Sequence, residues 1–330
     1  MTKENEQKKE DLLVVKNLKK YFPITKGFTK KVVAHVKATD DVSFTIKRGE
    51  TLSLVGESGC GKSTTGRAIL RLHEPTSGEI YFKGKNIMEL PKKDLKPLRK
   101  EMQIIFQDPY SSLNPRMSVG QLVGEGMKIH KICNSEAEYN EKITEVVERC
   151  GLANYHINRY PHQFSGGQRQ RIGIARALAL NPEFIVCDEP VSALDVSIQS
   201  QVINLMMDLQ EEFGMSYLFI SHDLSVVKHI SNNVGVMYLG SLVEIGNKND
   251  VYSNPKHPYT EILLKAIPRP NPEKGFEGTP IDGDLPSNVN LPAGCKFNTR
   301  CPYAKPKCFE EIPLLREITP GHRVACHYAE

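Results

Sequence analysis

A glycine-rich loop between an apolar strand and a helix constrains the fold of this chain more than any other feature. The apolar run LSLV (52–55) predicts a short buried strand, and TTGRAILRL (64–72) predicts a helix. Glycines between them let the backbone turn tightly and direct its N–H groups at an anion. Because the amide end of the helix adds a positive dipole, the sequence predicts a phosphate-binding loop. Its residues are Gly56, Glu57, Ser58, Gly59, Cys60, Gly61, Lys62, Ser63 and Thr64.

Two residues of this loop carry groups suited to a nucleoside triphosphate. The Lys62 amine reaches the β- and γ-phosphates, and the Ser63 hydroxyl is a ligand for Mg²⁺. A chance glycine-rich turn would not place strand, helix and Lys-Ser together at this spacing. Cys60 is interpreted as a small filler residue rather than a redox switch. The sequence therefore predicts an α/β fold of the P-loop NTPase type.

A second apolar strand delivers two carboxylates. FIVC (184–187) is followed directly by Asp188 and Glu189. An acidic pair at a strand end is often only a solvated turn, but beside a phosphate-binding loop it predicts metal binding and hydrolysis. We expect Asp188 to hold Mg²⁺ through water and Glu189 to polarise the attacking water.

The chain after this acidic pair predicts a buried helix and a further strand. The motif Ser-Ala-Leu-Asp195 precedes the helix, and Tyr217–Ile220 reads as a strand that ends just before His222. His222 either hydrogen-bonds the γ-phosphate or caps the next helix. The apolar steps of four and three predict one buried helix face. That face consists of positions 198, 202, 205, 209 and 213.

The segment FSGGQ (164–168) lies between the two phosphate motifs. Ser165 is a good helix N-cap, and the predicted helix that it caps runs through Arg169 to Leu180 with its amide end open to an anion. Here the chain resembles the ATP-binding subunits of ABC transporters. FSGGQ is similar to their signature motif, with Phe164 in place of the commoner Leu. The residues that match are Ser165, Gly166, Gly167 and Gln168.

Four more positions carry the same resemblance. Gln107 in IIFQDP resembles the Q-loop, Asp195 in SALD the D-loop, and His222 the switch histidine. Tyr21 in NLKKYF matches the aromatic residue that stacks on adenine, with Phe22 as the alternative. The resemblance implies ATP and Mg²⁺ as cofactors. It implies a catalytic set of Glu189, His222 and Gln107, and a Mg²⁺ set of Ser63, Gln107 and Asp188.

The resemblance also implies an architecture and partners. We expect an ABC ATPase core at 12–250 that contains a helical subdomain at about 110–180. This core is expected to form a nucleotide-sandwich dimer with a second ABC ATPase. A paralogue is favoured over an identical copy as that second ATPase. The helical subdomain would contact two transmembrane permease subunits, and an extracytoplasmic substrate-binding protein would take part indirectly. The expected location is peripheral, on the cytoplasmic face of the membrane.

The C-terminal part of the chain indicates which branch of the family the chain resembles. Twelve of the 21 prolines lie in the last 80 residues, which marks a boundary near 250 and a loop-rich extension at 251–330. NPKHPYTEILLKAIP (254–268) and the cysteine-containing segment after it resemble the C-terminal region of oligopeptide, dipeptide and nickel importer ATPases. The N-terminal KKYFPITKG segment resembles the second of the two ATPase subunits of oligopeptide importers. Import of oligopeptides or dipeptides is therefore the expected role.

Four cysteines in the last 36 residues suggest a small lobe that is stabilised by a bound metal. Their segment is rich in proline and poor in apolar residues, so it could hardly bury a core of its own. Their spacing fits neither a zinc ribbon nor a ferredoxin, and it leaves an iron–sulfur cluster, zinc and unligated thiols open. The family resemblance favours a [4Fe–4S] cluster. We interpret His322 and His327 as polar loop residues rather than metal ligands. The cysteines are Cys295, Cys301, Cys308 and Cys326.

Charge and spacing argue against other functions. The net charge is only +4, because residues 1–50 carry +5 and the rest of the chain carries −1. Residues 1–11 are expected to form a flexible basic arm, and no nucleic-acid partner is expected. Gln107 and Ser165 are 58 positions apart, which leaves no room for the long coiled coil of DNA-repair relatives. Ribosome-acting relatives carry two cores, whereas one set of motifs occurs here. The same role for nickel or another small solute remains an alternative, and a soluble scaffold ATPase a distant one.

Overall fold

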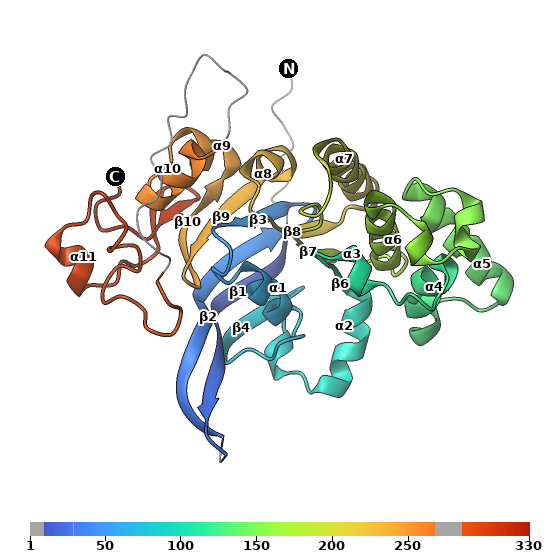
Figure 1. The fold of residues 1–330 in the computed structure, drawn as a ribbon, viewed down its shortest axis with the longest axis horizontal. Coiled ribbons are helices and arrows are strands. Elements are labelled where there is room, and N and C mark those ends of the chain that lie inside the picture. The colour runs from blue at the N-terminus through green and yellow to red at the C-terminus, as the bar shows by residue number, and fades with distance from the viewer. Residues whose placement is uncertain (1–9, 29, 268–285) are drawn as a thin grey trace. The chain divides into compact units, whose positions relative to one another are not determined.

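The structure is a computed structural model that describes residues 10–28, 30–267 and 286–330 (Figure 1). The chain forms two compact units. The first unit contains Glu10, Lys47–Glu50 and Glu89–Ile220. The second contains the described residues of the remainder. Residues 1–9 of the predicted N-terminal arm lie outside the described residues.

The first unit combines parallel strands with a group of helices. Strand β7 pairs in parallel with β6 and with β8, so that Cys187 faces Ile105 on one side and Phe219 on the other. The strands are β6 (Met102–Ile105), β7 (Phe184–Asp188) and β8 (Ser216–Ile220). The helices are α2 (Leu95–Glu101), α3 (Pro109–Ser112), α4 (Val119–Ile129), α5 (Glu136–Arg149), α6 (Gly166–Leu178) and α7 (Val196–Phe213).

The second unit contains two runs of hydrogen-bonded strands. One has the order β2-β1-β4-β5, and the other runs β11-β12-β10-β9-β3, with β3 and β9 parallel. The strands are β1 (Asp11–Lys26), β2 (Lys31–Lys47), β3 (Thr51–Val55), β4 (Ser77–Phe82), β5 (Lys85–Asn86), β9 (Asn233–Tyr238), β10 (Ser241–Asn247), β11 (Arg316–Thr319) and β12 (His322–Val324). The helices are α1 (Lys62–Ile69), α8 (Leu224–Ile230), α9 (Lys248–Ser253), α10 (Pro258–Lys265) and α11 (Pro306–Glu310).

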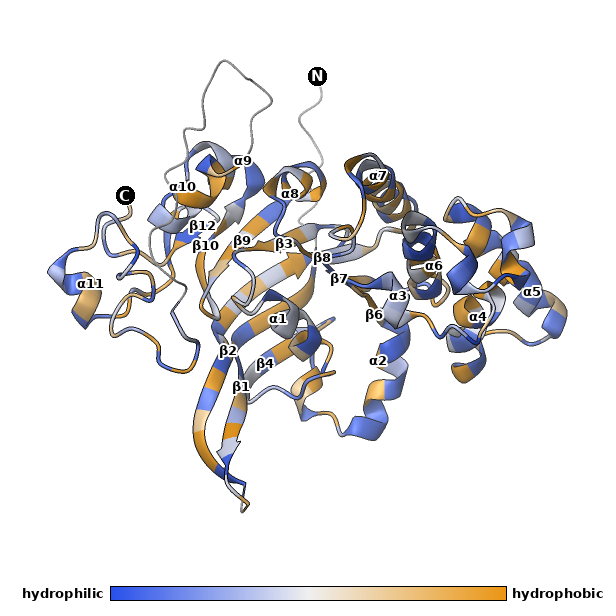
Figure 2. Cartoon of the chain, viewed as in Figure 1, coloured by the Kyte–Doolittle hydropathy of each residue, from blue (hydrophilic) through white to orange (hydrophobic). Residues whose placement is uncertain are grey.

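The predicted buried strands are present close to their expected bounds. Every residue of β3, β7 and β8 is buried, as the continuous apolar runs require of strands covered on both faces. Figure 2 shows these strands as predominantly hydrophobic. Helix α1 begins two residues earlier than predicted, at Lys62, and helix α6 begins at Gly166 and ends two residues earlier, at Leu178.

The buried face of α7 differs from the predicted one. Val202 and Leu209 are buried as expected, but positions 198, 205 and 213 are only half-buried. Ile203 and Met206 take their place in the core. The buried face of α7 is therefore rotated about the helix axis by about one residue from the predicted face. The Met206 carbonyl oxygen also accepts a hydrogen bond of 3.0 Å from the buried Tyr217 hydroxyl.

Among the described residues, none of the helices has both the length and the apolar character needed to cross a lipid bilayer.

Candidate functional site

The predicted phosphate-binding loop connects β3 to the N-terminus of α1 in the second unit. Lys62 is 4% exposed, and its Nζ donates hydrogen bonds to the carbonyl oxygens of Gly56 at 2.7 Å and Glu57 at 3.0 Å. Gly61 is the N-cap of α1, and no side chain caps the helix there. The first turn therefore keeps its amide groups for an external anion, as a phosphate site requires.

Two glycines of the loop are required by close backbone approach. Gly56 has φ +144°, and a Cβ atom there would lie 2.2 Å from the Met237 carbonyl oxygen. Gly61 has φ +105°, and its Cβ would lie 1.9 Å from the Ala38 carbonyl oxygen. No side chain fits at either position, so the loop can wrap closely only with glycine.

The other loop residues differ in exposure. Ser58 and Gly59 are exposed, whereas Ser63 and Thr64 are half-buried at the start of α1. Cys60 is fully buried, and its burial raises the pKa of the thiol. A buried thiol with a raised pKa is a poor nucleophile, which agrees with its interpretation as a filler.

The predicted adenine-stacking residue is fixed by a polar contact. Tyr21 lies in β1 of the second unit, and its hydroxyl donates to the Asp40 carboxylate. Burial and this hydrogen bond raise the pKa of the phenol. The Lys37 Nζ lies 5.9 Å from the centre of the ring. The alternative residue, Phe22, instead packs edge-on against His73 at 5.6 Å.

The two carboxylates after β7 differ in surroundings. Asp188 ends the strand and is fully buried. Glu189 has φ +47°, and its carboxylate accepts a hydrogen bond of 2.9 Å from Gln107 Nε2. Its N–H donates to the Ile220 carbonyl oxygen at 3.0 Å. The structure thus brings the predicted base and the predicted Q-loop residue together within the first unit.

The signature segment forms a helix start with an exposed tip. Ser165 Oγ accepts from the Gln168 N–H at 3.3 Å, and Gln168 Oε1 accepts from the Ser165 N–H at 3.1 Å. This reciprocal pair is a capping box, which fixes the first turn of α6. Ser165 and Gly166 are exposed, and a Cβ at Gly167 would lie 2.4 Å from Ile198 Cγ2. Asp195, the N-cap of α7, is exposed as well.

His222 follows directly on the strand that the sequence predicted. It is exposed and lies two residues after the end of β8, in the second unit. The alternative, in which His222 caps the next helix, is wrong. Asp223 is the N-cap of α8, and its Oδ1 accepts from the N–H groups of Ser225 at 2.8 Å and Val226 at 3.3 Å.

Two cations of the C-terminal extension contact residues near the phosphate loop, and sequence reasoning missed both. Arg300 forms two hydrogen bonds to the Glu57 carboxylate, at 2.9 and 3.2 Å. Lys296 Nζ donates to Asp40 Oδ2 at 2.8 Å. Burial alone would raise the pKa of Asp40, but hydrogen bonds from Lys296 and Tyr21 outweigh it and lower the pKa. No motif in the sequence indicated these pairs.

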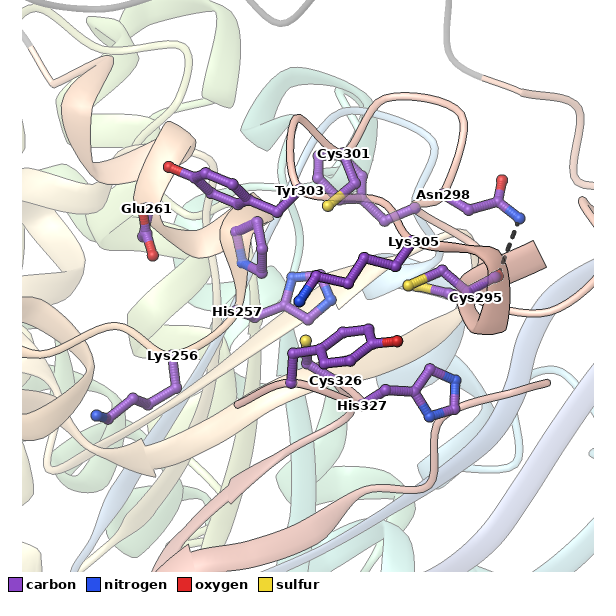
Figure 3. A pocket seen from close by; sticks show the side chains of 14 residues that line it. Lys256, His257, Glu261, Cys295, Asn298, Cys301, Tyr303, Lys305, Cys326 and His327 are labelled. Atoms are coloured by element: carbon purple, nitrogen blue, oxygen red, sulfur yellow. Dashed lines mark hydrogen bonds between the residues drawn. The ribbon is translucent and has the colours of Figure 1, made fainter. Parts of the chain in front are cut away.

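The four predicted cysteines line one cavity of the second unit, with a volume of about 290 Å³ (Figure 3). Burial raises the pKa of Cys295 to about 11 and also raises the pKa of Cys301. The cavity wall also includes His257, Phe297 and His327. Among the described residues, no group of three or more His, Cys, Asp or Glu side chains is arranged to hold a metal ion.

One histidine of this region does not have the predicted surroundings. His322 is not a loop residue, because it begins β12 and is only 2% exposed. Its Nε2 is 2.7 Å from Oε1 of the fully buried Glu244. Glu244 also accepts from the N–H groups of Lys256 and His257, so this pair joins β12 to β10 and to the segment before α10.

Comparisons with known proteins show which family the chain belongs to. Residues 39–192 match the family model described as ABC transporter, and residues 243–308 match the oligopeptide/dipeptide transporter C-terminal region. The oligopeptide transport ATP-binding protein AppF of Bacillus subtilis is 56% identical over 321 residues, covering 96% of this chain and 97% of AppF. The chain belongs to the ABC transporter family. It is an ABC-type ATPase.

Other relatives support the same assignment. The dipeptide transport ATP-binding protein DppF of Haemophilus influenzae is 51% identical over 319 residues, with 97% of each chain covered. Among solved structures, the ATP-binding cassette MJ0796 bound to ADP and Pi matches with a TM-score of 0.64 and 28% identity, covering 72% of this chain and 99% of that one. The predicted fold class, a P-loop ABC ATPase core, is confirmed by these matches.

A second solved structure extends the comparison. CbiO1 of Clostridium perfringens, part of the ABC transporter complex CbiONQ, matches with a TM-score of 0.63 and 28% identity. The match covers 74% of this ABC ATPase and 92% of CbiO1. The shared region is therefore nearly the whole of a smaller cassette, and the present chain is longer than that cassette.

Proposed function

We propose that this ABC ATPase hydrolyses ATP to drive import of oligopeptides or dipeptides through partner permeases. The observation that carries the proposal is the identity of more than half of its residues with an oligopeptide transport ATP-binding protein over almost the full length of both chains. The matched oligopeptide/dipeptide C-terminal region supports the same cargo.

Each site residue has a proposed role in nucleotide binding. The backbone of the loop Gly56–Thr64 and the Lys62 amine bind the phosphates, and Tyr21 stacks on adenine. Lys62 now donates to two carbonyl oxygens of the loop, and an incoming γ-phosphate would take over these hydrogen bonds. Magnesium, when bound, neutralises phosphate charge. The residues proposed to hold it are Ser63, Gln107 and, through water, Asp188.

Glu189 is the proposed general base. Its carboxylate accepts the proton of the attacking water, and Gln107 orients it through the 2.9 Å hydrogen bond. The positive φ of Glu189 is an uncommon conformation for a residue with a side chain, of the kind that gathers at functional sites. His222 is the proposed hydrogen-bond donor to the γ-phosphate.

The signature residues are proposed to act on a second ATPase subunit. Ser165, Gly166, Gly167, Gln168 and Asp195 would close over the nucleotide held by the partner. Exposure of Ser165, Gly166 and Asp195 supports this role, because a group that contacts a partner must be at the surface. We favour a paralogue as that partner, and hence a heterodimer.

The remaining partners follow from the importer role. The helical subdomain at about 110–180, within a core at 12–250, would contact two transmembrane permease subunits. An extracytoplasmic binding protein would deliver the cargo without touching this chain. The proposed location is thus peripheral, on the cytoplasmic face of the membrane. Nickel as cargo remains the alternative, although both relatives described above are named for peptides.

A [4Fe–4S] cluster in the C-terminal extension, 251–330, is part of the proposal. The four cysteines share one cavity, and four thiolates are the ligand set of such a cluster. Among the described residues no group of three or more His, Cys, Asp or Glu side chains is arranged to hold a metal ion, so the proposal rests on the shared cavity and on the family resemblance.

The cluster has a direct spectroscopic test. Anaerobically purified protein is expected to show a broad absorbance near 400 nm together with bound iron and sulfide. Replacement of Cys301 by Ser is expected to reduce all three signals. Zinc without iron in elemental analysis, or protein without any metal, would contradict the proposal.

Transport is tested by uptake in cells. We expect cells that carry Glu189→Gln in place of the native chain to lose uptake of labelled short peptides and to keep uptake of labelled nickel. Loss of nickel uptake alone would indicate that the protein drives import of nickel and not of peptides. Retention of both would contradict the importer assignment. Immunoblotting of the variant checks that the chain is still made.

A further inference from the structure

A cation of the C-terminal extension forms a two-bonded ion pair with the phosphate-binding loop. Arg300 Nη1 donates to Glu57 Oε2 at 2.9 Å, and Nη2 donates to Oε1 at 3.2 Å. The Arg300 side chain is 7% exposed and that of Glu57 is 24% exposed. Both residues belong to the second unit, although 243 positions separate them in the chain. Planar, paired contacts of this kind are among the strong charge-assisted hydrogen bonds.

Further contacts join the same two segments. The Glu57 N–H donates to the Tyr259 hydroxyl at 2.9 Å, and Asn288 Nδ2 donates to the Gly59 carbonyl oxygen at 3.0 Å. Tyr259 is fully buried and packs against Tyr238 and Phe297, with ring centres 4.8 and 5.3 Å apart. The extension therefore contacts the side chain and the backbone of the loop, from a packed aromatic cluster.

Glu57 poses an electrostatic problem that Arg300 resolves. The loop is to receive the anionic phosphates of ATP, and a carboxylate within it repels them. Arg300 neutralises this charge and holds the carboxylate toward the extension. Two of the cavity cysteines lie beside the contact in sequence, because Cys301 follows Arg300 and Cys295 precedes Lys296, which pairs with Asp40.

We propose that Arg300 is a positioning residue for ATP binding, through which the C-terminal extension sets the nucleotide affinity of the phosphate-binding loop. Arg300 does not touch the nucleotide; it acts through Glu57. The inference rests on the proposed nucleotide site and adds a residue outside the nucleotide-binding sequence motifs that affects nucleotide affinity. Because coupling between sites is reciprocal, bound ATP also stabilises the contact between the loop and the cysteine segment.

The test is a double-mutant cycle on the full chain, with affinity measured for a non-hydrolysable ATP analogue in the presence of Mg²⁺. We expect Arg300→Ala to weaken binding on the order of tenfold, within the usual range for coupled sites. Glu57→Gln alone is expected to weaken binding less than Arg300→Ala does, because it removes the carboxylate that repels the phosphates. The combination of Glu57→Gln with Arg300→Ala is expected to recover most of the loss, since no uncompensated carboxylate remains. Arg300→Lys keeps the positive charge but not the paired hydrogen bonds. Its affinity for the analogue is expected to lie between those of the wild type and Arg300→Ala.

Controls separate positioning from general destabilisation. Lys307→Ala removes another cation of the extension, one whose described ion pair is with Glu311 four residues away, and it should leave affinity unchanged. In steady-state assays Arg300→Ala should raise KM for ATP and leave kcat near the wild-type value.

Two results would overturn the inference. Arg300→Ala could bind the analogue as tightly as the wild type, or the double variant could bind as weakly as Arg300→Ala, which would indicate a merely structural role. A wild-type chain that binds no analogue would instead overturn the proposed nucleotide site itself. The two failures are therefore distinguishable.

Discussion

Ser165 and Ser118 begin two helices of the same unit with the same arrangement of hydrogen bonds. Each hydroxyl accepts from the N–H of a glutamine three residues later at 3.3 Å, and each serine N–H donates back to that glutamine's side chain. A capping box stabilises a helix start whatever its function. Only Ser165 belongs to the proposed signature. Variants at the two serines therefore distinguish a loss of helix stability from a loss of catalysis.

Replacement of either serine by Ala should cost about 1 kcal/mol of unfolding free energy, the usual value of an N-cap. Ser165→Ala is expected also to lower ATP hydrolysis more than tenfold, because the lost hydroxyl is the one proposed to meet the partner's nucleotide. Ser118→Ala is expected to retain hydrolysis. Thermal unfolding and phosphate release measure the two effects. Equal activity of the two variants would contradict the role of Ser165.

Single residues divide sharply into those that the sequence could predict and those it could not. The positions of Lys62 at the start of α1 and of Glu189 after β7 were predictable, because they depend on near neighbours in the chain and on the strand that precedes them. Arg300 was not, since its partner Glu57 lies 243 positions away and no local pattern connects them. The surroundings of His322 were mispredicted for the same reason, because β12 exists only through pairing with β10 and β11.

Secondary-structure elements were predicted best where one physical signal dominated. Continuous apolar runs located β3, β7 and β8 to within one residue, because only buried strands tolerate such runs. The buried stripe of α7 was misplaced by about one residue. Apolar side chains are abundant on that helix, and the core selects Ile203 and Met206 over position 205 by packing, which periodicity alone does not encode.

The whole molecule shows what a motif-based prediction omits. Family motifs account for the loop, the acidic pair and the signature helix, whereas the contacts of the C-terminal extension with the loop are visible only in three dimensions. In the second unit, Arg300, Asn288 and Tyr259 tie this extension to the phosphate-binding loop. An ATPase with this extension is therefore expected to differ from a shorter cassette in the control of nucleotide affinity.

This chain is proposed to hydrolyse ATP in an assembled transporter, with Glu189 as the base. The most direct test is to purify the membrane complex through a tag on this chain, load it with ATP and Mg²⁺, and identify the nucleotide that remains after gel filtration. The wild type should release product and retain little ATP. The Glu189→Gln complex should retain unhydrolysed ATP in a closed assembly of ATPase subunits. Hydrolysis by the variant at the wild-type rate would contradict the role of Glu189 as the base.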